Sequence, residues 1–264
     1  QNIQRNLLYN IHMVNQNMPQ SKNQYQEPKP TFAIIVGLIA ASIIIGACIL
    51  FAINGNKTVA PIVSDALPAP ELSEGIRGSE FGIDKNINET TLDNYLGRSD
   101  TVYRDMRMLK DPGNYEAIGG DSYLSGFVEG FEVVPLPYLV NVAGLPEEVG
   151  DTYTGKTLFT QTKDGKYIAN YAESMDILEY LFPKDKNIFL MCGGGGYAGM
   201  TKTMLTKLGW DENKIYNVGA YWSYDGDHNI IVKNTSHGDT TYDFWKVPYH
   251  DIDFNTLHEL KHEA

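Results

Sequence analysis

A cysteine followed directly by four glycines is the feature of this sequence best suited to chemistry. Glycine lets consecutive backbone N–H groups turn toward one point, and the start of a following helix adds the positive end of its dipole. Such a loop stabilises a thiolate or a sulfur-bearing anion and lowers the pKa of the cysteine. We therefore predict a nucleophile, Cys192, and a substrate-binding loop made of Gly193, Gly194, Gly195, Gly196, Tyr197 and Ala198. A buried structural cysteine beside a glycine-rich turn is the alternative.

The elements on either side of this run would place the thiol at the edge of a parallel sheet. Residues 188–191 are continuously apolar, as expected for a strand that helices cover on both faces. Residues 173–182 and 197–208 carry apolar side chains at helical spacing. Cys192 would then stand at the carboxyl end of a strand, where ligands tend to bind in open α/β sheets.

From residue 90 onward the predicted elements alternate as in an α/β layer structure with a mainly parallel sheet flanked by helices. We predict one domain over 90–264, with a hairpin insertion near 157–171 and a C-terminal extension over 227–264. The other predicted elements are a short helix at 91–96 and strands at 101–106, 132–135 and 215–219.

An uncharged, apolar stretch at residues 31–54 is long enough to cross a hydrocarbon core of about 30 Å as a helix. We predict a single transmembrane anchor, and the distribution of basic and acidic residues around it favours an extracytoplasmic domain. A lipoprotein anchor at Cys48, which follows Ile45-Gly46-Ala47, is one alternative. A cleaved secretory signal is the other, although its apolar region normally runs to only about 7–15 residues. Cys48 is the only other cysteine, so we expect no disulfide with Cys192.

The remaining N-terminal parts read as irregular chain. Residues 1–30 are rich in Gln and Asn and are predicted to be disordered, with Met13 as an alternative first residue. Residues 55–89 contain prolines, glycines and serines without an apolar period, which predicts a flexible linker. The formal net charge of −12 argues against a nucleic-acid partner, which would call for a basic face.

The region from about residue 91 to 226 resembles a rhodanese domain, a sulfurtransferase fold with one reactive cysteine. Asp105-Met106-Arg107 resembles the family's Asp-x-Arg, and Gly126-Phe127-Val128-Glu129-Gly130 resembles its Gly-His-Ile-x-Gly segment. The run from Cys192 to Ala198 resembles its active loop, and Trp222 fits its closing Gly-aromatic turn. The resemblance implies that Asp105 and Arg107 support the loop by hydrogen bonds to its backbone.

The activity that this resemblance implies is transfer of sulfane sulfur through a persulfide on Cys192. The donor would be thiosulfate, a polysulfide or a persulfide, and the acceptor a thiol or cyanide, with no cofactor and no metal. Many active relatives carry a cation within the loop, whereas Tyr197 stands at that position here. We therefore expect doubly charged thiosulfate to be a poorer donor than a polysulfide.

Three other functions are weighed against this one. A phosphatase of the Cys-x5-Arg type needs an arginine where Ala198 stands, and a disulfide oxidoreductase needs a second nearby cysteine. A noncatalytic rhodanese-like module that binds a partner protein at the membrane surface stays open as the alternative to an enzyme.

Overall fold

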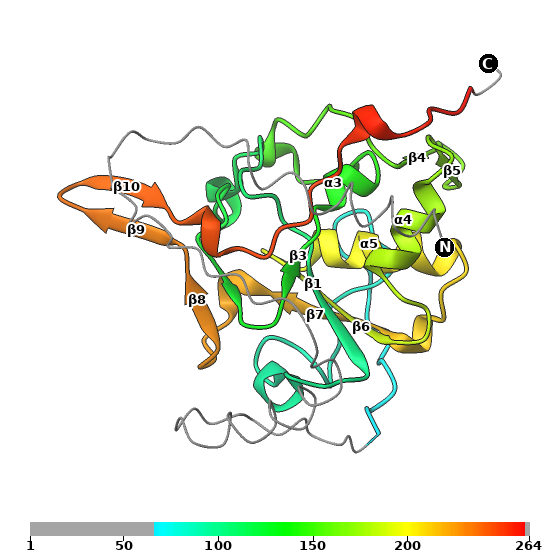
Figure 1. Ribbon diagram of the computed structural model, residues 1–264. Coiled ribbons are helices and arrows are strands. Elements are labelled where there is room, and N and C mark those ends of the chain that lie inside the picture. The colour runs from blue at the N-terminus through cyan, green and yellow to red at the C-terminus, as the bar shows by residue number, and fades with distance from the viewer. Residues whose placement is uncertain (1–65, 262–264) are drawn as a thin grey trace, which may run out of the picture. The chain divides into compact units, whose positions relative to one another are not determined.

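The centre of the domain is a four-stranded parallel sheet with the strand order β3-β1-β6-β7 (Figure 1). The structure is a computed structural model, and it describes residues 66–261. The strands of the sheet are β1 (Thr101–Asp105), β3 (Glu132–Val133), β6 (Asn187–Cys192) and β7 (Ile215–Ala220). The predicted α/β class with a mainly parallel sheet is confirmed. The predicted tail at 1–30 and anchor at 31–54 lie outside the described residues. Within residues 66–261, no helix has the length and apolar character needed to span a membrane.

An irregularity in the sheet immediately precedes Cys192. The pairing of β6 with β7 shifts between Leu190 and Met191, so that Cys192 lies opposite Ala220. The unpaired residue is Val218 of β7, and the next residue, Gly219, has a left-handed φ of 93°, which favours glycine. Bulges re-aim the side chains that follow them. This one lies in β7 and determines which residue of that strand stands beside Cys192.

Three helices cover one face of the sheet: α3 (Leu136–Leu139), α4 (Ser174–Leu181) and α5 (Gly196–Lys207). Because side chains alternate along a strand, Ile188 and Leu190 of β6 face these helices, together with Cys192. The predicted helices at 173–182 and 197–208 agree with α4 and α5 within two residues.

The other face of the sheet is covered by the chain that precedes β1, not by an α-helix. Phe189 and Met191 pack there against Ile87 and against Leu92 of a short 3-10 helix, and Leu67 adds to the same cluster. This is where the structure departs from the predicted linker at 55–89, because its described part, 66–89, lies against the domain.

Side-chain hydrogen bonds replace secondary structure in this N-terminal segment. The Asp84 carboxylate accepts from the backbone N–H groups of Glu71, Asn86 and Ile87, and the Thr203 hydroxyl of α5 accepts from that of Glu80. Such bonds do not require apolar residues at the regular spacing of a helix or a strand. The segment therefore reads as a linker although it is packed.

Three antiparallel pairs surround the main sheet. β4 (Phe159–Gln161) pairs with β5 (Tyr167–Ala169), which confirms the predicted hairpin. β2 (Gly126–Val128) pairs with β8 (Asn229–Ile231), and β9 (Lys233–Ser236) pairs with β10 (Asp239–Tyr242). The further 3-10 helices are Tyr115–Ile118, Glu147–Val149, Glu212–Lys214, Tyr221–Ser223, Phe244–Lys246 and Phe254–Thr256.

The C-terminal extension returns to the sheet after β10. A single parallel bridge joins Tyr249 to Val133 of β3, with hydrogen bonds from the Val133 N–H to the Pro248 carbonyl and from the His250 N–H to the Val133 carbonyl. The extension therefore covers the outer edge of β3.

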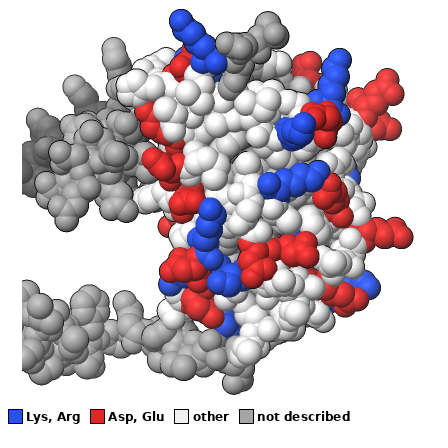
Figure 2. Space-filling view, turned by 90° about the vertical axis from the view of Figure 1, so that its right-hand side faces the viewer, with Lys and Arg blue, Asp and Glu red and all other residues white. Residues whose placement is uncertain are grey.

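Acidic and basic side chains are interspersed on the face of the described domain that Figure 2 shows. Several charged side chains of the described domain form exposed ion pairs, among them Lys85 with Glu71 and Lys207 with Glu80. This face offers no continuous basic stripe to a nucleic acid.

Candidate active site

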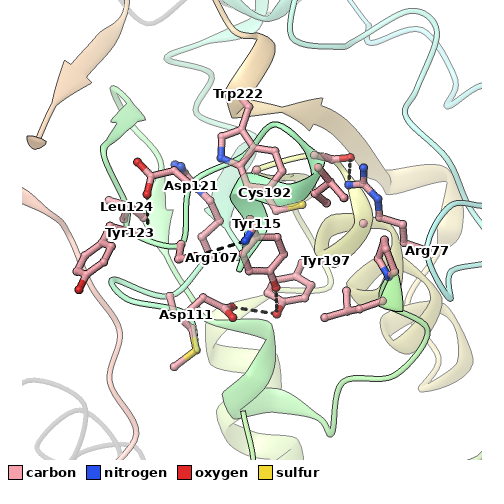
Figure 3. Close-up of a pocket in the computed structure, with 18 residues that line it drawn as sticks. Arg77, Arg107, Asp111, Tyr115, Asp121, Tyr123, Leu124, Cys192, Tyr197 and Trp222 are labelled. Carbon is pink, nitrogen blue, oxygen red and sulfur yellow. Dashed lines mark hydrogen bonds between the residues drawn. The ribbon is translucent and has the colours of Figure 1, made fainter. Parts of the chain in front are cut away.

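Cys192 ends β6 and lies at the wall of a pocket of about 40 Å³. Its side chain is only 3% exposed and makes no disulfide. By the same measure a single water needs roughly 10–15 Å³, so the pocket suits a ligand of a few heavy atoms or the reactive end of a larger one. Figure 3 shows the thiol among side chains from several elements, including Arg107, Tyr115, Tyr197 and Trp222.

The first turn of α5 closes on the thiol. Backbone hydrogen bonds from Tyr197 and Ala198 reach Cys192, as expected for an amide-lined loop. Of the other loop residues predicted to bind substrate, Gly193, Gly194 and Gly196 line the pocket. Gly195 begins the helix with a φ of 82°, and its carbonyl accepts a 3.0 Å hydrogen bond from Asn217 Nδ2 of β7.

The four glycines are needed because other parts of the chain pack directly on the loop. A Cβ on Gly193 would stand 2.3 Å from the ring of Trp222, and one on Gly195 would stand 2.9 Å from Ile83. On Gly194 it would stand 2.3 Å from Arg77 Nη1. Glycine at these positions thus permits close packing of other segments on the loop, a role that could not be predicted from the sequence.

The pKa of Cys192 is raised, so the lowered pKa predicted from the sequence is wrong. Burial is the largest cause, and the nearby Asp105 carboxylate adds to it. The hydrogen bonds from Ala198 and Tyr197 and the positive charge of Arg107 act in the opposite direction but are outweighed. The prediction considered the amides and the helix dipole, but not the cost of desolvating a thiolate in a closed site. At neutral pH Cys192 is therefore a thiol.

This raised pKa predicts the pH dependence of Cys192 alkylation. Only the thiolate reacts with iodoacetamide, and its fraction grows with pH until the pKa is passed. We expect the rate in the folded protein to keep rising beyond pH ~8.5, where an unperturbed cysteine is half ionised. Mass spectrometry of the Cys192 peptide gives the rate, and the same peptide in denaturant gives the unperturbed curve. A plateau already reached near neutrality would contradict this assignment.

Asp105 and Arg107 form a buried ion pair beside the pocket. Arg107 Nε lies 2.9 Å from Asp105 Oδ1, and its Nη2 donates to the Gly126 carbonyl at 2.8 Å. The guanidinium also lies 4.0 Å from the centre of the Tyr221 ring. These partners replace the bonds to the loop backbone that the resemblance implies. Arg107 Nη1 is buried without a hydrogen-bond partner, and the residue lines the pocket. Asp105 therefore holds the Arg107 guanidinium next to the thiol, and Nη1 of that guanidinium has no hydrogen-bond partner.

Two tyrosines and a carboxylate form a hydrogen-bonded chain along another wall. The Tyr115 and Tyr197 hydroxyls lie 2.6 Å apart, and Tyr197 donates to Asp111 Oδ2 at 3.0 Å (Figure 3). Burial raises the pKa of both phenols and of Asp111, so the hydroxyls stay protonated at neutral pH. Tyr197, which stands where the resemblance expects a cation, is thus fixed as a neutral donor.

Trp222 closes the pocket over the loop. Its backbone N–H donates to the Gly193 carbonyl at 3.1 Å, and its ring centre lies 5.6 Å from that of Tyr115. Its indole Nε1 is buried without a hydrogen-bond partner. Two residues that line the pocket, Arg107 and Trp222, therefore each have a buried N–H donor without a partner.

Arg77, Asp111 and Tyr115 are among the pocket residues that sequence reasoning missed. Arg77 belongs to the segment that reads as a linker, and it lies more than a hundred residues from the loop in sequence. Asp111 and Tyr115 belong to the irregular stretch after β1. Asp111-Pro112-Gly113 is a turn signal, but nothing in its pattern indicates a contact with Tyr197.

Comparisons with known proteins do not relate this chain to a family. No family model matches it, and neither the curated proteins nor the solved structures give a match. Among residues 66–261, no group of three or more His, Cys, Asp or Glu side chains could hold a metal ion. The site brings together a thiol, two amide donors, a buried guanidinium and a small pocket, which are groups that nucleophilic chemistry on a small anion would use.

Proposed function

We propose that the protein is a sulfurtransferase that carries sulfane sulfur as a persulfide on Cys192. One observation carries the proposal: the only cysteine in the described residues accepts hydrogen bonds from the loop backbone at Tyr197 and Ala198 while lining a small pocket with Arg107. Amide donors aimed at sulfur would stabilise both the thiolate and the persulfide anion. The donor would be thiosulfate, a polysulfide or a persulfide, and the acceptor a thiol or cyanide.

The reaction has two displacement steps. The Cys192 thiol first loses its proton to solvent, and the thiolate attacks the outer sulfur of the donor. A sulfur–sulfur bond forms to Cys192 while the donor's own bond to that sulfur breaks, and the leaving group takes the electron pair, as sulfite does from thiosulfate. Cyanide or a thiolate then attacks the outer sulfur and releases the Cys192 thiolate. This is a ping-pong scheme with a covalent intermediate.

The rhodanese likeness supports the same proposal. The resemblance implies a parallel sheet with the cysteine at the end of a strand and a glycine loop that opens a helix, as β6 and α5 have here. It also implies an acidic–basic pair near the loop, and the buried Asp105–Arg107 pair lies beside the thiol. The free Arg107 Nη1 and Trp222 Nε1 suit an anionic donor. We propose a rhodanese-like domain on these grounds.

We also propose that this domain is held at the cell membrane by one transmembrane helix over 31–54 and faces outward. The proposal rests on the apolar, uncharged character of that stretch and on the acidic residues that follow it. Lipid attachment at Cys48 stays the alternative anchor.

A noncatalytic binding module is the second candidate, and the burial of Cys192 favours it. A thiol that is 3% exposed and has a raised pKa is less reactive than a free cysteine at neutral pH. If this reading is right, the pocket would recognise a partner and Cys192 would only fill the core.

Steady-state turnover separates the two candidates. We expect the full chain in detergent to form thiocyanate from cyanide with thiosulfate or polysulfide, with parallel lines in double-reciprocal plots, as a ping-pong scheme requires. The rate should increase with pH, because the raised pKa of Cys192 keeps the thiolate fraction low at neutrality. Absence of turnover with every donor at alkaline pH would reject the enzyme and favour the binding module.

A further inference from the structure

Arg77 reaches the glycine loop from a segment that precedes the α/β sheet in sequence. Its Nη1 donates to the Gly194 carbonyl at 3.0 Å (Figure 3). The stem of the side chain lies along the loop, because a Cβ on Gly196 would stand 3.0 Å from Arg77 Cδ. The contact thus spans the two loop glycines that flank Gly195.

The backbone at Arg77 adopts a conformation that side chains normally avoid. Its φ is 46°, and only one other described residue that is not glycine, His237, has a positive φ. Such strain costs on the order of 1 kcal/mol or more and persists only where the surroundings enforce it. Ser79, two residues on, is held by the carbonyl of Phe81 and lies next to Thr203 of α5. The segment is therefore fixed directly after the turn that aims Arg77 at the loop.

The charge of Arg77 has no counter-ion in the described part of the chain. None of the ion pairs there includes Arg77, although acidic residues outnumber basic ones, 33 to 21, over the whole sequence. Arg77 lines the same pocket as Cys192, and so does Arg107 with its free Nη1. Two guanidinium groups therefore line one small pocket. Asp111 and Asp121 line it too, but Asp111 accepts a hydrogen bond from Tyr197 and Asp121 pairs with Lys233, so neither carboxylate is paired with Arg77 or Arg107.

We propose that Arg77 is the cation of the active loop, supplied from outside it, and that it binds the anionic group of the sulfur donor together with Arg107. This role of Arg77 rests on the proposed sulfur transfer, and it specifies that the sulfur donor carries a negatively charged group. The loop has Tyr197 where a cation is expected, and Arg77 restores the positive charge in space. It reverses the expectation that thiosulfate is a poor donor: a dianion fits this pocket better than a donor with a single negative charge.

Two donors that differ by one charge test the proposal. Thiosulfate is a dianion, and methanethiosulfonate has a methyl group in place of one anionic oxygen. Because charge-assisted hydrogen bonds are the strong ones, we expect Arg77→Gln to raise the KM for thiosulfate by about tenfold or more. The KM for methanethiosulfonate should rise far less, and the KM for cyanide in the second half-reaction should not change. Arg77→Lys, which keeps the charge, should recover part of the preference for thiosulfate.

Lys85→Gln is the matched control, because Lys85 is a cation of the same segment whose side chain is 61% exposed and pairs with Glu71. We expect it to leave both KM values unchanged. If Arg77 only braces the loop, Arg77→Gln will lower kcat with both donors alike and leave the ratio of their KM values unchanged. That result would overturn the proposal.

Protection of Cys192 from iodoacetamide by sulfite tests Arg77 without turnover. We expect sulfite to protect the natural chain and the Lys85→Gln variant, and to protect Arg77→Gln at least several-fold less well. Equal protection in all three proteins would overturn the role of Arg77. If sulfite protection depends on Arg77 but no donor is turned over, the proposed transferase activity fails while the anion site stands.

Discussion

Replacing Cys192 by serine is expected to reduce sulfur transfer at least about a thousandfold, to the background rate. Serine differs from cysteine by one atom and can still accept the hydrogen bonds from Tyr197 and Ala198, so the loop should keep its structure. Its hydroxyl cannot form a persulfide, and no other cysteine occurs among the described residues. Thiocyanate formation measured with saturating donor gives the size of the loss.

Cys48→Ser provides the matched control for this variant, because it removes the other cysteine of the sequence. We expect it to retain the full rate. Substantial transfer by Cys192→Ser, or its loss in Cys48→Ser, would show that the sulfur is carried elsewhere than proposed. Unchanged circular dichroism and an unchanged urea midpoint would show that Cys192→Ser is folded.

Replacing Asp105 by asparagine is expected to lower the free energy of unfolding by about 3–5 kcal/mol, the typical cost of removing one partner from a buried ion pair. Asp105 is fully buried, and Arg107 is 7% exposed, so no solvent can replace the lost charge. Arg107 keeps its bond to the Gly126 carbonyl and its contact with Tyr221, but these are neutral groups. Urea denaturation followed by tryptophan fluorescence measures the change, which should appear in the midpoint with the slope unaltered.

The exposed pair of Lys166 with Asp164 offers the comparison. Their side chains are 78% and 58% exposed, and exposed pairs contribute little to stability. Asp164→Asn should therefore leave the urea midpoint within experimental error. If Asp105→Asn behaved in the same way, Arg107 would not be a buried charge that needs Asp105 as its counter-ion.

The local parts of the site could be predicted from the sequence. An apolar run, a cysteine, four glycines and an amphipathic segment lie within about twenty residues, and each step is fixed by neighbours in sequence. The structure accordingly has β6 ending at Cys192 and α5 beginning at Gly196. The hairpin of β4 and β5 was predicted for the same reason, from an Asp-Gly turn between alternating residues.

The parts that depend on contacts between distant segments could not be predicted. Arg77 belongs to a stretch without helical or strand periodicity, and its place over Gly194 is set by side-chain bonds to α5 and by packing on the sheet. The raised pKa of Cys192 has a similar origin. Amides adjacent in sequence lower this pKa, whereas the burial that raises it comes from residues such as Tyr115 and Trp222, which are far away along the chain. Local pattern thus pointed to Cys192 and its glycine loop, but neither to the Arg77 guanidinium beside that loop nor to the raised pKa of the thiol.

The most direct test of a sulfur-carrying Cys192 is the mass of the protein after exposure to a donor. The full chain, incubated with polysulfide or thiosulfate at alkaline pH and freed of excess reagent, should gain the mass of one sulfur atom. Peptide mapping should place that sulfur on Cys192, and addition of cyanide should remove it as thiocyanate. A chain that gains no sulfur at Cys192, or holds sulfur there that cyanide does not remove, would contradict the proposed function.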